Sequence, residues 1–554
     1  MTGTSPFAFV LGYRPVPGPA DRILHHARVV RTLVDAGLIA PTRPDRLALA
    51  GRSLLRWGTA SAGAVAVAAA RAPHQPALID ELGTLSYGEL HRRANALASS
   101  LAAHGIRPGD GVAIMCRNHR GFMDATVACS RLGAHALYLN TMFAAPQLAD
   151  VVAREGASAI VYDEEFAALL GEVRGIDKRF VAWRDGESDA GEAGGDPLLE
   201  DLIAAGDSAG VPPAEEPGRV VILTSGTTGT PKGARRSSAG LSSAAALLSK
   251  IPYRAREVTM IAAPLFHSWG LANYTLGVPL ASTFVLRRRF DPEGTLRAIA
   301  RHRATALVVV PVMLQRILEL PQETLDRYDT SSLRVIAVSG SALPGPLATR
   351  VMDQFGDVLY NLYGSTEVAW ATIATPDDLR AAPGCAGRPP LGTVVKLFDE
   401  HDREVAPGQT GRIFVASGFP FEGYTGGDTK ATIGELMSSG DVGHFDAAGR
   451  LFIDGRDDDM IVSGGENVFP AEVEDLLAGH ECVREVAVVG VADEAWGQRL
   501  KAVVVLQEGE RATADELKDY VKRNLGAFKV PREIAFVEAL PRNATGKVLK
   551  RDLV

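Results

Sequence analysis

The strongest chemical signal in the sequence is an apolar run that leads into a loop of glycines, hydroxyl side chains and a lysine. Residues 220–233 have the sequence VVILTSGTTGTPKG. Gly226 and Gly229 would let backbone N–H groups approach an anion closely, because neither residue has a Cβ. Hydroxyl and ammonium groups that could bind phosphate oxygens belong to Thr224, Ser225, Thr227, Thr228 and Lys232. The stretch therefore predicts a strand followed by a phosphate-binding loop.

The spacing of this loop differs from that of a Walker P-loop. The Walker pattern is GxxxxGK[ST], whereas here Pro231 precedes the lysine and Gly233 follows it. A flexible Gly/Thr linker is also disfavoured, since a linker would not combine an apolar strand with a Pro-Lys-Gly exit. We therefore expect a nucleotide-phosphate loop of another class.

Four further segments contain side chains that could take part in chemistry, although each has an ordinary explanation when it is considered alone. His267 in PLFHSWGL would be a packed core histidine, and Glu367 in NLYGSTE would be a solvated carboxylate. Asp441 in the tripeptide SGD would lie in a surface turn, and Lys547 in PRNATGK would be a solvated lysine. The order of these segments along the chain favours a different interpretation.

The loop TSGTTGTPKG resembles the phosphate loop of the adenylate-forming superfamily, which contains acyl-CoA synthetases, peptide-synthetase adenylation domains and luciferases. Segments that resemble its other motifs follow in the superfamily's order, and the resemblance covers about residues 60–554. These segments are PLFHSWGL, SGSALP, NLYGSTE, SGD and PRNATGK. Chance agreement at so many separate motifs is negligible. The resemblance implies an enzyme that activates a carboxylic acid with ATP as an acyl-adenylate.

The resemblance also implies a nucleotide site. Tyr363 would stack on adenine, Thr366 would bind the α-phosphate, and Glu367 would hold Mg²⁺, a cation that prefers oxygen ligands. Asp441 would accept hydrogen bonds from both ribose hydroxyls, and Arg456 would also contact the ribose. The remaining residues of the implied nucleotide site are Gly340, Ser341, Ala342, Asn361 and Gly364.

Other residues are implied to act on the acid and on coenzyme A. Lys547 would reach the carboxylate and the α-phosphate and stabilise the charge that develops as pyrophosphate leaves, and His267 would lie near the carboxylate at the mouth of the acyl tunnel. Asp458 falls at the superfamily's hinge. The loop that resembles the pantetheine tunnel contains Gly464 and Gly465, and Trp496 is a candidate wall of that tunnel, with core packing as the alternative.

The pattern of elements predicts an α/β fold. Helices between short β-rich runs indicate parallel sheets covered on both faces, and Ser86 with Glu89 has the spacing of a capping box that begins a helix running to about His104. We expect a basic N-terminal extension over 1–57, a large ATP- and acyl-binding domain over 58–455, and a small mobile α+β domain over 456–554. Residues 184–218 are expected to form a solvated linker or a surface loop.

The acyl substrate is less closely defined. Amino-acid-activating relatives place an aspartate where this chain has His267-Ser268, so an amino acid is disfavoured. The apolar pocket candidates favour a medium- or long-chain fatty acid that is transferred to coenzyme A. An aryl-acid CoA ligase and an acyl-AMP ligase that loads a separate carrier protein remain as alternatives. A non-catalytic binding protein is the third, and the presence of Glu367, Asp441 and Lys547 argues against it.

Composition excludes several other classes of protein. The chain has 554 residues and a net charge of −8, which argues against nucleic acid as the main partner. Its four cysteines are far apart and form no CxxC pair, so we expect a reducing cytoplasm and neither a disulfide framework nor a structural zinc site. The start of the chain does not resemble a signal peptide, and the most apolar run, residues 60–70, is too short to span a bilayer.

The first 57 residues differ from the rest, with eight arginines against three aspartates. A helix is expected over 20–38, and one of its faces carries an apolar stripe made of Ile23, Ala27, Val30 and Val34. Such a helix could pack on the body of the enzyme. Alternatively, it could give a weak peripheral contact with an anionic membrane, because a basic amphipathic helix suits that surface.

Overall fold

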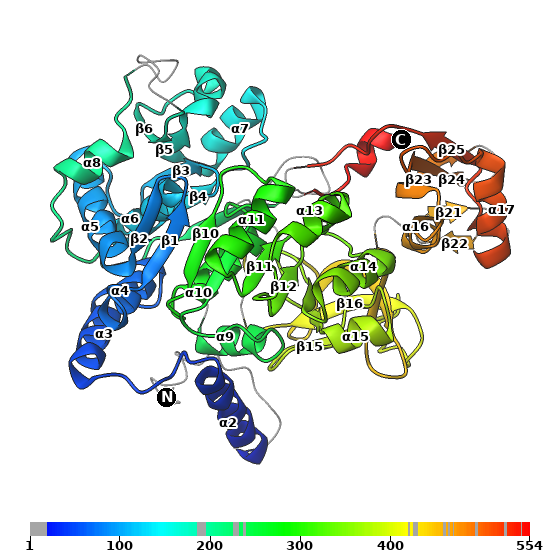
Figure 1. Cartoon of the computed structure of the whole chain (residues 1–554), viewed down its shortest axis with the longest axis horizontal. Coiled ribbons are helices and arrows are strands. Elements are labelled where there is room, and N and C mark those ends of the chain that lie inside the picture. Colours follow the sequence, from blue (N-terminus) through cyan, green and yellow to red (C-terminus); the bar gives the residue numbers. More distant parts are fainter. Residues whose placement is uncertain are drawn as a thin grey trace. The chain divides into compact units, whose positions relative to one another are not determined.

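The computed structural model describes most of the chain (Figure 1). The described residues are 19–185, 195–224, 232–236, 240–418, 421–424, 430–457, 461–463, 466–468, 470–493, 497–525, 529–543 and 546–554. The chain divides into two compact units. Unit 1 comprises Met1–Val309, Glu319–Ala337 and Gly418–Thr429, and unit 2 comprises Val310–Leu318, Val338–Ser417 and Lys430–Val554.

The first sheet of unit 1 has the strand order β17-β8-β7-β4-β3-β5-β6. Its strands from β7 to β6 are parallel, and β8 and β17 continue it in antiparallel pairing. The strand bounds are β3 (Gly111–Met115), β4 (His135–Tyr138), β5 (Ala157–Asp163), β6 (Lys178–Trp183), β7 (Val220–Thr224), β8 (Lys232–Arg236) and β17 (Phe421–Tyr424).

A second run of strands in unit 1 has the order β11-β9-β10-β1-β2 and is parallel except for the hairpin of β1 with β2. The strand bounds are β1 (Pro76–Asp80), β2 (Gly83–Ser86), β9 (Val258–Ile261), β10 (Thr283–Leu286) and β11 (Ala306–Val309). Strand β12 (Val335–Val338) lies at the boundary between the units in the sequence.

Two features of unit 1 agree with the sequence predictions. Residues 112–115 of β3 are wholly buried, as expected for a parallel strand covered on both faces. Ser86 and Glu89 form the predicted capping box at the start of α5 (Tyr87–Ala103). The other helices of this unit are α4 (Ser61–Arg71), α6 (Arg120–Leu132), α7 (Ala145–Glu155), α9 (Leu241–Leu248), α10 (Ser268–Gly277), α11 (Pro292–His302), α13 (Gln322–Arg327) and the 3₁₀ helix η1 (Glu164–Glu172).

The prediction that residues 184–218 form only a linker is wrong for part of that stretch. Helix α8 (Leu199–Ala205) lies within it and packs on α5. Leu199 and Leu202 are buried, and the Ser100 hydroxyl donates to the Leu202 carbonyl at 2.6 Å. Two leucines three residues apart share one helix face, a signal that the surrounding Gly, Ala and acidic residues concealed.

The N-terminal helix is shorter than predicted and packs through another face. Helix α2 (Pro19–Asp35) contacts α9 and is followed by α3 (Pro44–Trp57). Its buried side chains are Val29 and Leu33, whereas the predicted stripe of Ile23, Ala27, Val30 and Val34 is exposed. Packing has selected the narrower apolar face of the helix.

Unit 2 contains an antiparallel sheet, a separate small C-terminal sheet, and the antiparallel pair of β13 with β14. The first sheet has the order β15-β16-β19-β18, and β20 pairs with β19. The bounds are β13 (Leu359–Tyr363), β14 (Thr372–Ala374), β15 (Val394–Phe398), β16 (Gly411–Ala416), β18 (Thr432–Ile433), β19 (Leu436–Phe445) and β20 (Leu451–Arg456), with helices α12 (Pro311–Leu318), α14 (Gly345–Phe355) and α15 (Pro376–Ala381).

The C-terminal sheet has the order β22-β21-β24-β23, with β25 parallel to β24, and has its own buried core. It confirms the predicted α/β class with a small α+β part at the C-terminus. The bounds are β21 (Ile461–Ser463), β22 (Glu466–Val468), β23 (Val483–Asp493), β24 (Gly497–Leu506), β25 (Glu533–Phe536), α16 (Pro470–Ala478), α17 (Ala514–Leu525) and the 3₁₀ helix η3 (Lys550–Leu553).

Two further findings concern the described residues as a whole. Among the helices that they form, none is both long and apolar enough to cross a membrane. The four cysteines, which all lie within the described ranges, are buried free thiols.

Candidate active site

The centre of the candidate site in unit 2 is the carboxylate of Asp441 on β19. The Tyr363 hydroxyl, at the end of β13, donates to Asp441 Oδ2 at 2.6 Å and lies 3.1 Å from Ser439 Oγ. Arg456 on β20 is the register partner of Asp441. Strand pairing therefore brings Asp441 next to Arg456, and Tyr363 joins them from another sheet.

Burial and the neighbouring charges act in opposite directions on the Asp441 carboxyl group. Burial raises the pKa of Asp441, while the Tyr363 hydroxyl and the positive charges of Arg456, Lys547 and Lys430 oppose that rise. Burial, with the nearby Asp441 charge, raises the pKa of Tyr363 well above its ordinary value. The phenol therefore keeps its proton at neutral pH and remains a hydrogen-bond donor to the carboxylate.

Lys547 reaches this cluster from a tight turn near the C-terminus. The turn is closed because the Lys547 N–H donates to Asn543 Oδ1 and the Asn543 N–H donates to the Lys547 carbonyl, both at 2.9 Å. Gly546 has a φ of +79°, and a Cβ at this position would lie 2.4 Å from Cγ1 of Val312 on α12. The turn therefore packs so closely against α12 that only glycine fits at the position before the lysine.

Thr366 and Glu367 lie in the turn that connects β13 with β14. The Ser365 hydroxyl accepts from the N–H groups of Glu367 and Val368 at 3.2 and 3.3 Å. A Cβ at Gly364 would lie 2.1 Å from the Ala369 carbonyl oxygen, so the glycine permits the close return of the chain. Both predicted residues are half-buried, and Glu367 offers an oxygen ligand from an ordered turn.

The predicted adenine turn follows β12 and leads into α14. Gly340 has a φ of +101°, which a side chain would strain, and Ser341 and Ala342 precede the helix. Asn361 is buried on β13, two residues before Tyr363. The predicted adenine turn therefore lies between β12 and α14, and Asn361 lies on β13, the next strand along the chain.

The predicted phosphate loop belongs to unit 1, where it joins β7 to β8. Thr224 and Lys232 are register partners in this antiparallel pair. The predicted strand of four apolar residues before the loop is confirmed as β7, which also includes Thr224. The connecting residues lie outside the described ranges, and they include Ser225, Gly226, Thr227, Thr228 and Gly229. Asp458, Gly464, Gly465 and Trp496 lie outside those ranges as well.

His267 is the N-cap residue of α10 in unit 1. Burial lowers the pKa of His267 to about 4, so the ring is neutral at neutral pH. Its Nε2 atom is buried and has no hydrogen-bond partner among the described residues. Phe266 packs against the ring with 4.6 Å between centroids. The Nε2 atom can therefore accept or donate one hydrogen bond to a bound molecule.

The sequence analysis missed two polar residues beside Asp441. Lys430 contributes positive charge to the Asp441 environment, and a Cβ at Gly440 would lie 3.2 Å from Lys430 Nζ. Ser439 is buried and accepts from the Asp441 N–H at 3.1 Å. The serine of SGD was a visible signal. Lys430 had none, because only the fold brings it to the β19 turn.

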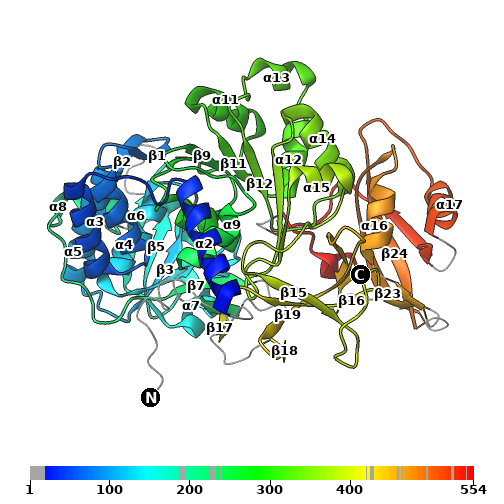
Figure 2. The ribbon, with the colours of Figure 1, turned by 90° about the horizontal axis from the view of Figure 1, so that it is seen from below.

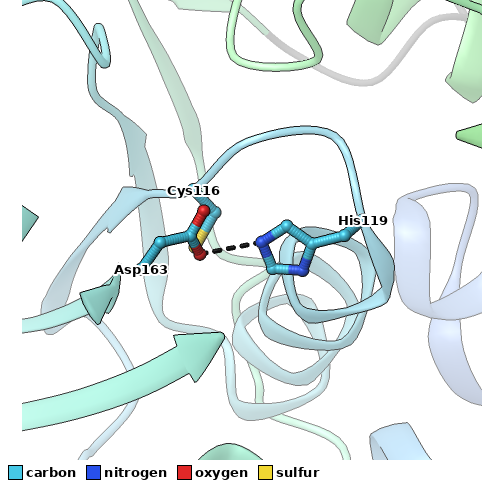
Figure 3. A group of neighbouring side chains, drawn as sticks. All are labelled: Cys116, His119 and Asp163. Atoms are coloured by element: carbon cyan, nitrogen blue, oxygen red, sulfur yellow. Dashed lines mark hydrogen bonds and ion pairs between the residues drawn. The ribbon is translucent and has the colours of Figure 1, made fainter. Parts of the chain in front are cut away.

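A second buried polar cluster lies in unit 1, and none of its three residues belongs to a motif named above. Cys116, His119 and Asp163 lie at the ends of β3 and β5, and their ligand atoms are within 4.8 Å of one another (Figure 3). His119 Nε2 lies 2.7 Å from Asp163 Oδ1, and His119 Nδ1 accepts from the Gly121 N–H at 3.1 Å.

Cys116 and His119 have a Cys-x₂-His spacing, a signal of this cluster that was visible in the sequence. Both imidazole nitrogens have hydrogen-bond partners, and Asp163 Oδ2 accepts from the Arg117 N–H at 2.9 Å. His119 is also the N-cap of α6. These bonds explain the cluster as a buried network that fixes the start of that helix.

Comparison with known protein families and structures gives a consistent assignment. A family model described as AMP-binding enzyme matches residues 65–425, and one described as AMP-binding enzyme C-terminal domain matches residues 472–547. The chain is 34% identical to a feruloyl-CoA synthase of Amycolatopsis sp. over 492 residues, which is 87% of this chain and 96% of the relative.

Two further similarities extend this result. An indoleacetate–CoA ligase of Aromatoleum aromaticum is 34% identical over 480 residues, covering 85% of this chain and 92% of the ligase. The solved structure of o-succinylbenzoate CoA synthetase from Bacillus subtilis, in complex with its acyl-adenylate intermediate, has a TM-score of 0.74 and 28% identity. That match covers 88% of this chain and 97% of the other chain. The chain therefore belongs to the AMP-binding enzyme family, within the adenylate-forming superfamily, and is an AMP-forming acyl-CoA synthetase.

Proposed function

We propose that the protein joins an aromatic carboxylic acid to coenzyme A in two half-reactions. In the first, a carboxylate oxygen of the acid attacks the α-phosphorus of ATP, and the bond to pyrophosphate breaks. In the second, the thiol sulfur of coenzyme A attacks the acyl carbon, and AMP leaves with the bonding electrons. No protein nucleophile is required, so the side chains act by positioning and by electrostatics.

The single observation that carries this proposal is the cluster around Asp441. Its carboxylate has two acceptor oxygens, as the two hydroxyls of a ribose require. The Tyr363 hydroxyl fixes its orientation at 2.6 Å, and positive charge comes from Arg456 and Lys547. This arrangement suits a nucleotide, because the Asp441 carboxylate can bind the sugar and the exposed Lys547 ammonium group can bind the phosphate.

Magnesium fits the oxygen ligand that Glu367 provides. We assign Glu367 to holding the ion because its half-buried carboxylate lies on an ordered turn next to Thr366, which we assign to the α-phosphate. A bound Mg²⁺ would neutralise charge on the phosphates and so assist the departure of pyrophosphate.

The proposed acid is aromatic because of the relatives and because of the environment of His267. The printed names of two relatives that share 34% identity with the chain contain feruloyl and indoleacetate, which are both aromatic acyl groups. A neutral, buried imidazole suits an uncharged acyl body. The fatty acid that the sequence favoured stays an untested prediction.

Further parts of the function are proposed from the motifs. We assign the hinge between the half-reactions to Asp458, and the pantetheine path to the loop with Gly464 and Gly465, with Trp496 as its wall. A cytoplasmic location is proposed because the four cysteines are free thiols. Contact of residues 1–57 with a membrane is a separate proposal that does not depend on the acid.

The test is a pyrophosphate-release screen of ferulic acid, indoleacetic acid and a series of fatty acids, each with and without coenzyme A. We expect aromatic acids to give the highest kcat/KM and AMP release to require the thiol. A preference for long fatty acids would overturn the substrate assignment alone. Absence of pyrophosphate release with every acid would favour a binding protein, and adenylation without thiol-dependent AMP release would favour a carrier-protein acceptor.

A further inference from the structure

The first two helices of unit 1 expose an unusual amount of aliphatic surface. Of the fifteen large apolar side chains that are exposed among the described residues, nine lie between residues 23 and 55. They are Ile23, Leu24, Val30, Val34, Ile39, Leu47, Leu49, Leu54 and Leu55. The concentration is local, since the other six are distributed over the rest of the chain.

Helix α2 is apolar on two faces and buries only one of them. Val29 and Leu33 are 2% and 1% exposed and pack toward α9, and the Ala36 carbonyl just after the helix accepts from the Ala255 N–H at 2.8 Å. The other face carries Ile23, which is 71% exposed, and Val30, which is 47% exposed. The helix is therefore anchored to unit 1 while a complete apolar stripe faces outward.

Helix α3 repeats this arrangement. Its only buried residue is Ala50, and it packs on α4. Leu47, Leu54 and Leu55 are 63%, 46% and 90% exposed. These three residues fall on one face because spacings of seven and eight residues return to the same side of a helix. Both helices lie on one side of unit 1, at its lower edge in Figure 1 and toward the viewer in Figure 2.

Arginines border these apolar faces. Exposed guanidinium groups in this segment belong to Arg22, Arg28, Arg31, Arg43, Arg52 and Arg56. The acidic residues of the same stretch are Asp21, Asp35 and Asp45, and two of them form exposed ion pairs with Arg31 and Arg43. The surface therefore combines aliphatic side chains with a positive net charge, although the whole chain carries a net charge of −8.

From this combination we propose that α2 and α3 form a docking surface for an anionic phospholipid membrane. The exposed leucine, isoleucine and valine side chains enter the boundary between head groups and acyl chains, and the arginines bind lipid phosphates. Charge complementarity decides the occupant. A second copy of the chain, docked face to face about a two-fold axis, would bring arginines against arginines. The nine exposed side chains include no aromatic residue, although aromatic anchors dominate protein–protein interfaces.

The test is co-sedimentation of the full-length protein with vesicles of phosphatidylglycerol and phosphatidylcholine in equal parts. The controls are vesicles of phosphatidylcholine alone, and each mixture is measured at low and at high salt. We expect binding to the anionic vesicles that weakens with salt, because arginine–phosphate attraction is screened. Little binding to neutral vesicles is expected.

The double variant Leu54→Ser, Leu55→Ser should weaken binding about tenfold for each leucine, since insertion into lipid is driven by apolar area. Its matched control is Leu82→Ser, because Leu82 is 57% exposed in unit 1 but lies outside the two helices. Reversal of charge in Arg28→Glu, Arg52→Glu should weaken binding about fivefold or more for each position. The matched control is Arg174→Glu, an exposed arginine elsewhere in unit 1.

Thermal unfolding of every variant verifies that the fold is intact. The proposal is overturned if the full-length protein ignores anionic vesicles at low salt, or if the leucine variant binds them like the wild type. It is also overturned if binding appears only after residues 1–18 are deleted, because that result would mean that these residues cover α2 and α3 in the full-length protein. A dimer that the leucine variant dissociates, without vesicle binding, would instead assign the surface to a second copy.

Discussion

Asp441 in unit 2 and His267 in unit 1 are both ionisable side chains in partly buried positions, but their surroundings differ. Asp441 accepts from the Tyr363 hydroxyl at 2.6 Å, and the charges of Arg456, Lys547 and Lys430 oppose the rise that burial causes in its pKa. His267 has a buried Nε2 without a hydrogen-bond partner among the described residues, and a pKa lowered to about 4 by burial alone.

The difference indicates a division of labour between polar and apolar binding. Around Asp441, a hydroxyl donor and three cations offset the cost of burying a carboxylate. The environment of His267 removes charge instead, since desolvation disfavours the protonated ring. We therefore expect changes near Asp441 to affect the adenylation rate and ATP binding, and changes at His267 to affect the acid and the pH dependence of stability.

The largest effect is expected for Lys547→Ala. Loss of the ammonium group should lower the rate of adenylation about a thousandfold, as removal of a group that stabilises transition-state charge does. Thioester formation from pre-formed acyl-adenylate should be nearly unchanged. Pyrophosphate exchange measures the first half-reaction, and thioester formation from the supplied adenylate measures the second.

The matched control for this variant is Lys550→Ala. Lys550 lies three residues away and pairs with Glu474 at 2.8 Å. We expect it to retain both half-reactions. If Lys547→Ala loses both half-reactions equally while it remains folded, the lysine acts in both steps and the proposed alternation about Asp458 is wrong.

A smaller loss of adenylation is expected for Gly546→Ala. The new Cβ would lie 2.4 Å from Cγ1 of Val312, and φ is +79°, so the turn must shift and displace Lys547. We expect a ten- to hundredfold lower rate, since misplacement of a catalytic group by about 1 Å has such a cost. Gly509→Ala separates the two causes, because Gly509 has a φ of +81° but no atom near the added Cβ.

Gly509→Ala should therefore cost only about 1 kcal/mol of stability, and Val312→Ala should restore activity to the Gly546 variant. An equally inactive Gly509 variant would show that backbone strain in the C-terminal sheet region limits the rate, and not the contact of the Lys547 turn with Val312.

The sequence predicted much of the frame of this site but little of its contacts. The strand before the phosphate loop, the capping box of α5 and the small C-terminal α+β part follow from local patterns, which a single segment carries. The hydrogen bond between Tyr363 and Asp441 joins residues 78 positions apart. It depends on how β13 of one sheet meets β19 of another sheet, where β19 pairs with β20, and no local pattern reveals this contact.

The same reason explains the wrong expectations. Helix α8 was hidden in a Gly- and Ala-rich stretch because only the contact of Leu202 with α5 distinguishes it from a linker. The broad stripe of α2 predicted the packed face, but Val29 and Leu33 are buried instead. Amphipathicity identifies an apolar face of a helix, and the neighbouring element decides which face is covered.

The KM for ATP is expected to rise about tenfold in Tyr363→Phe. The variant removes the donor to Asp441 Oδ2 but keeps the ring, and a hydrogen bond to a charged group contributes about 1.5–3 kcal/mol. We expect kcat to change little, because the phenol positions the carboxylate and does not touch the reacting phosphorus. Steady-state kinetics with varied ATP measures this. An unchanged KM with a reduced kcat would move Tyr363 from ribose binding to the chemical step.

The smallest effect on activity is expected for His267→Gln. This variant tests the comparison through the pH dependence of the free energy of unfolding. The ordinary histidine pKa of 6.5 falls to about 4 in the folded protein. Between these values the unfolded chain binds a proton that the folded chain does not, so stability is lost as pH falls from about 6.5 toward 4. The full loss is about 3 kcal/mol, and the glutamine variant should lack it.

His91→Gln is the matched variant, because burial and the neighbouring Arg131 also lower the His91 pKa to about 4. It should flatten the pH dependence in the same direction. His91 Nδ1 lies 3.0 Å from Arg131 Nη2, whereas His267 Nε2 has no hydrogen-bond partner among the described residues. The His91 variant should therefore also lose stability at pH 7, and the His267 variant should not. Urea unfolding at pH 7, 6, 5 and 4 compares the two. If His267→Gln is destabilised at pH 7 as strongly as His91→Gln, His267 forms a hydrogen bond in solution and the unpartnered Nε2 assigned to it is wrong.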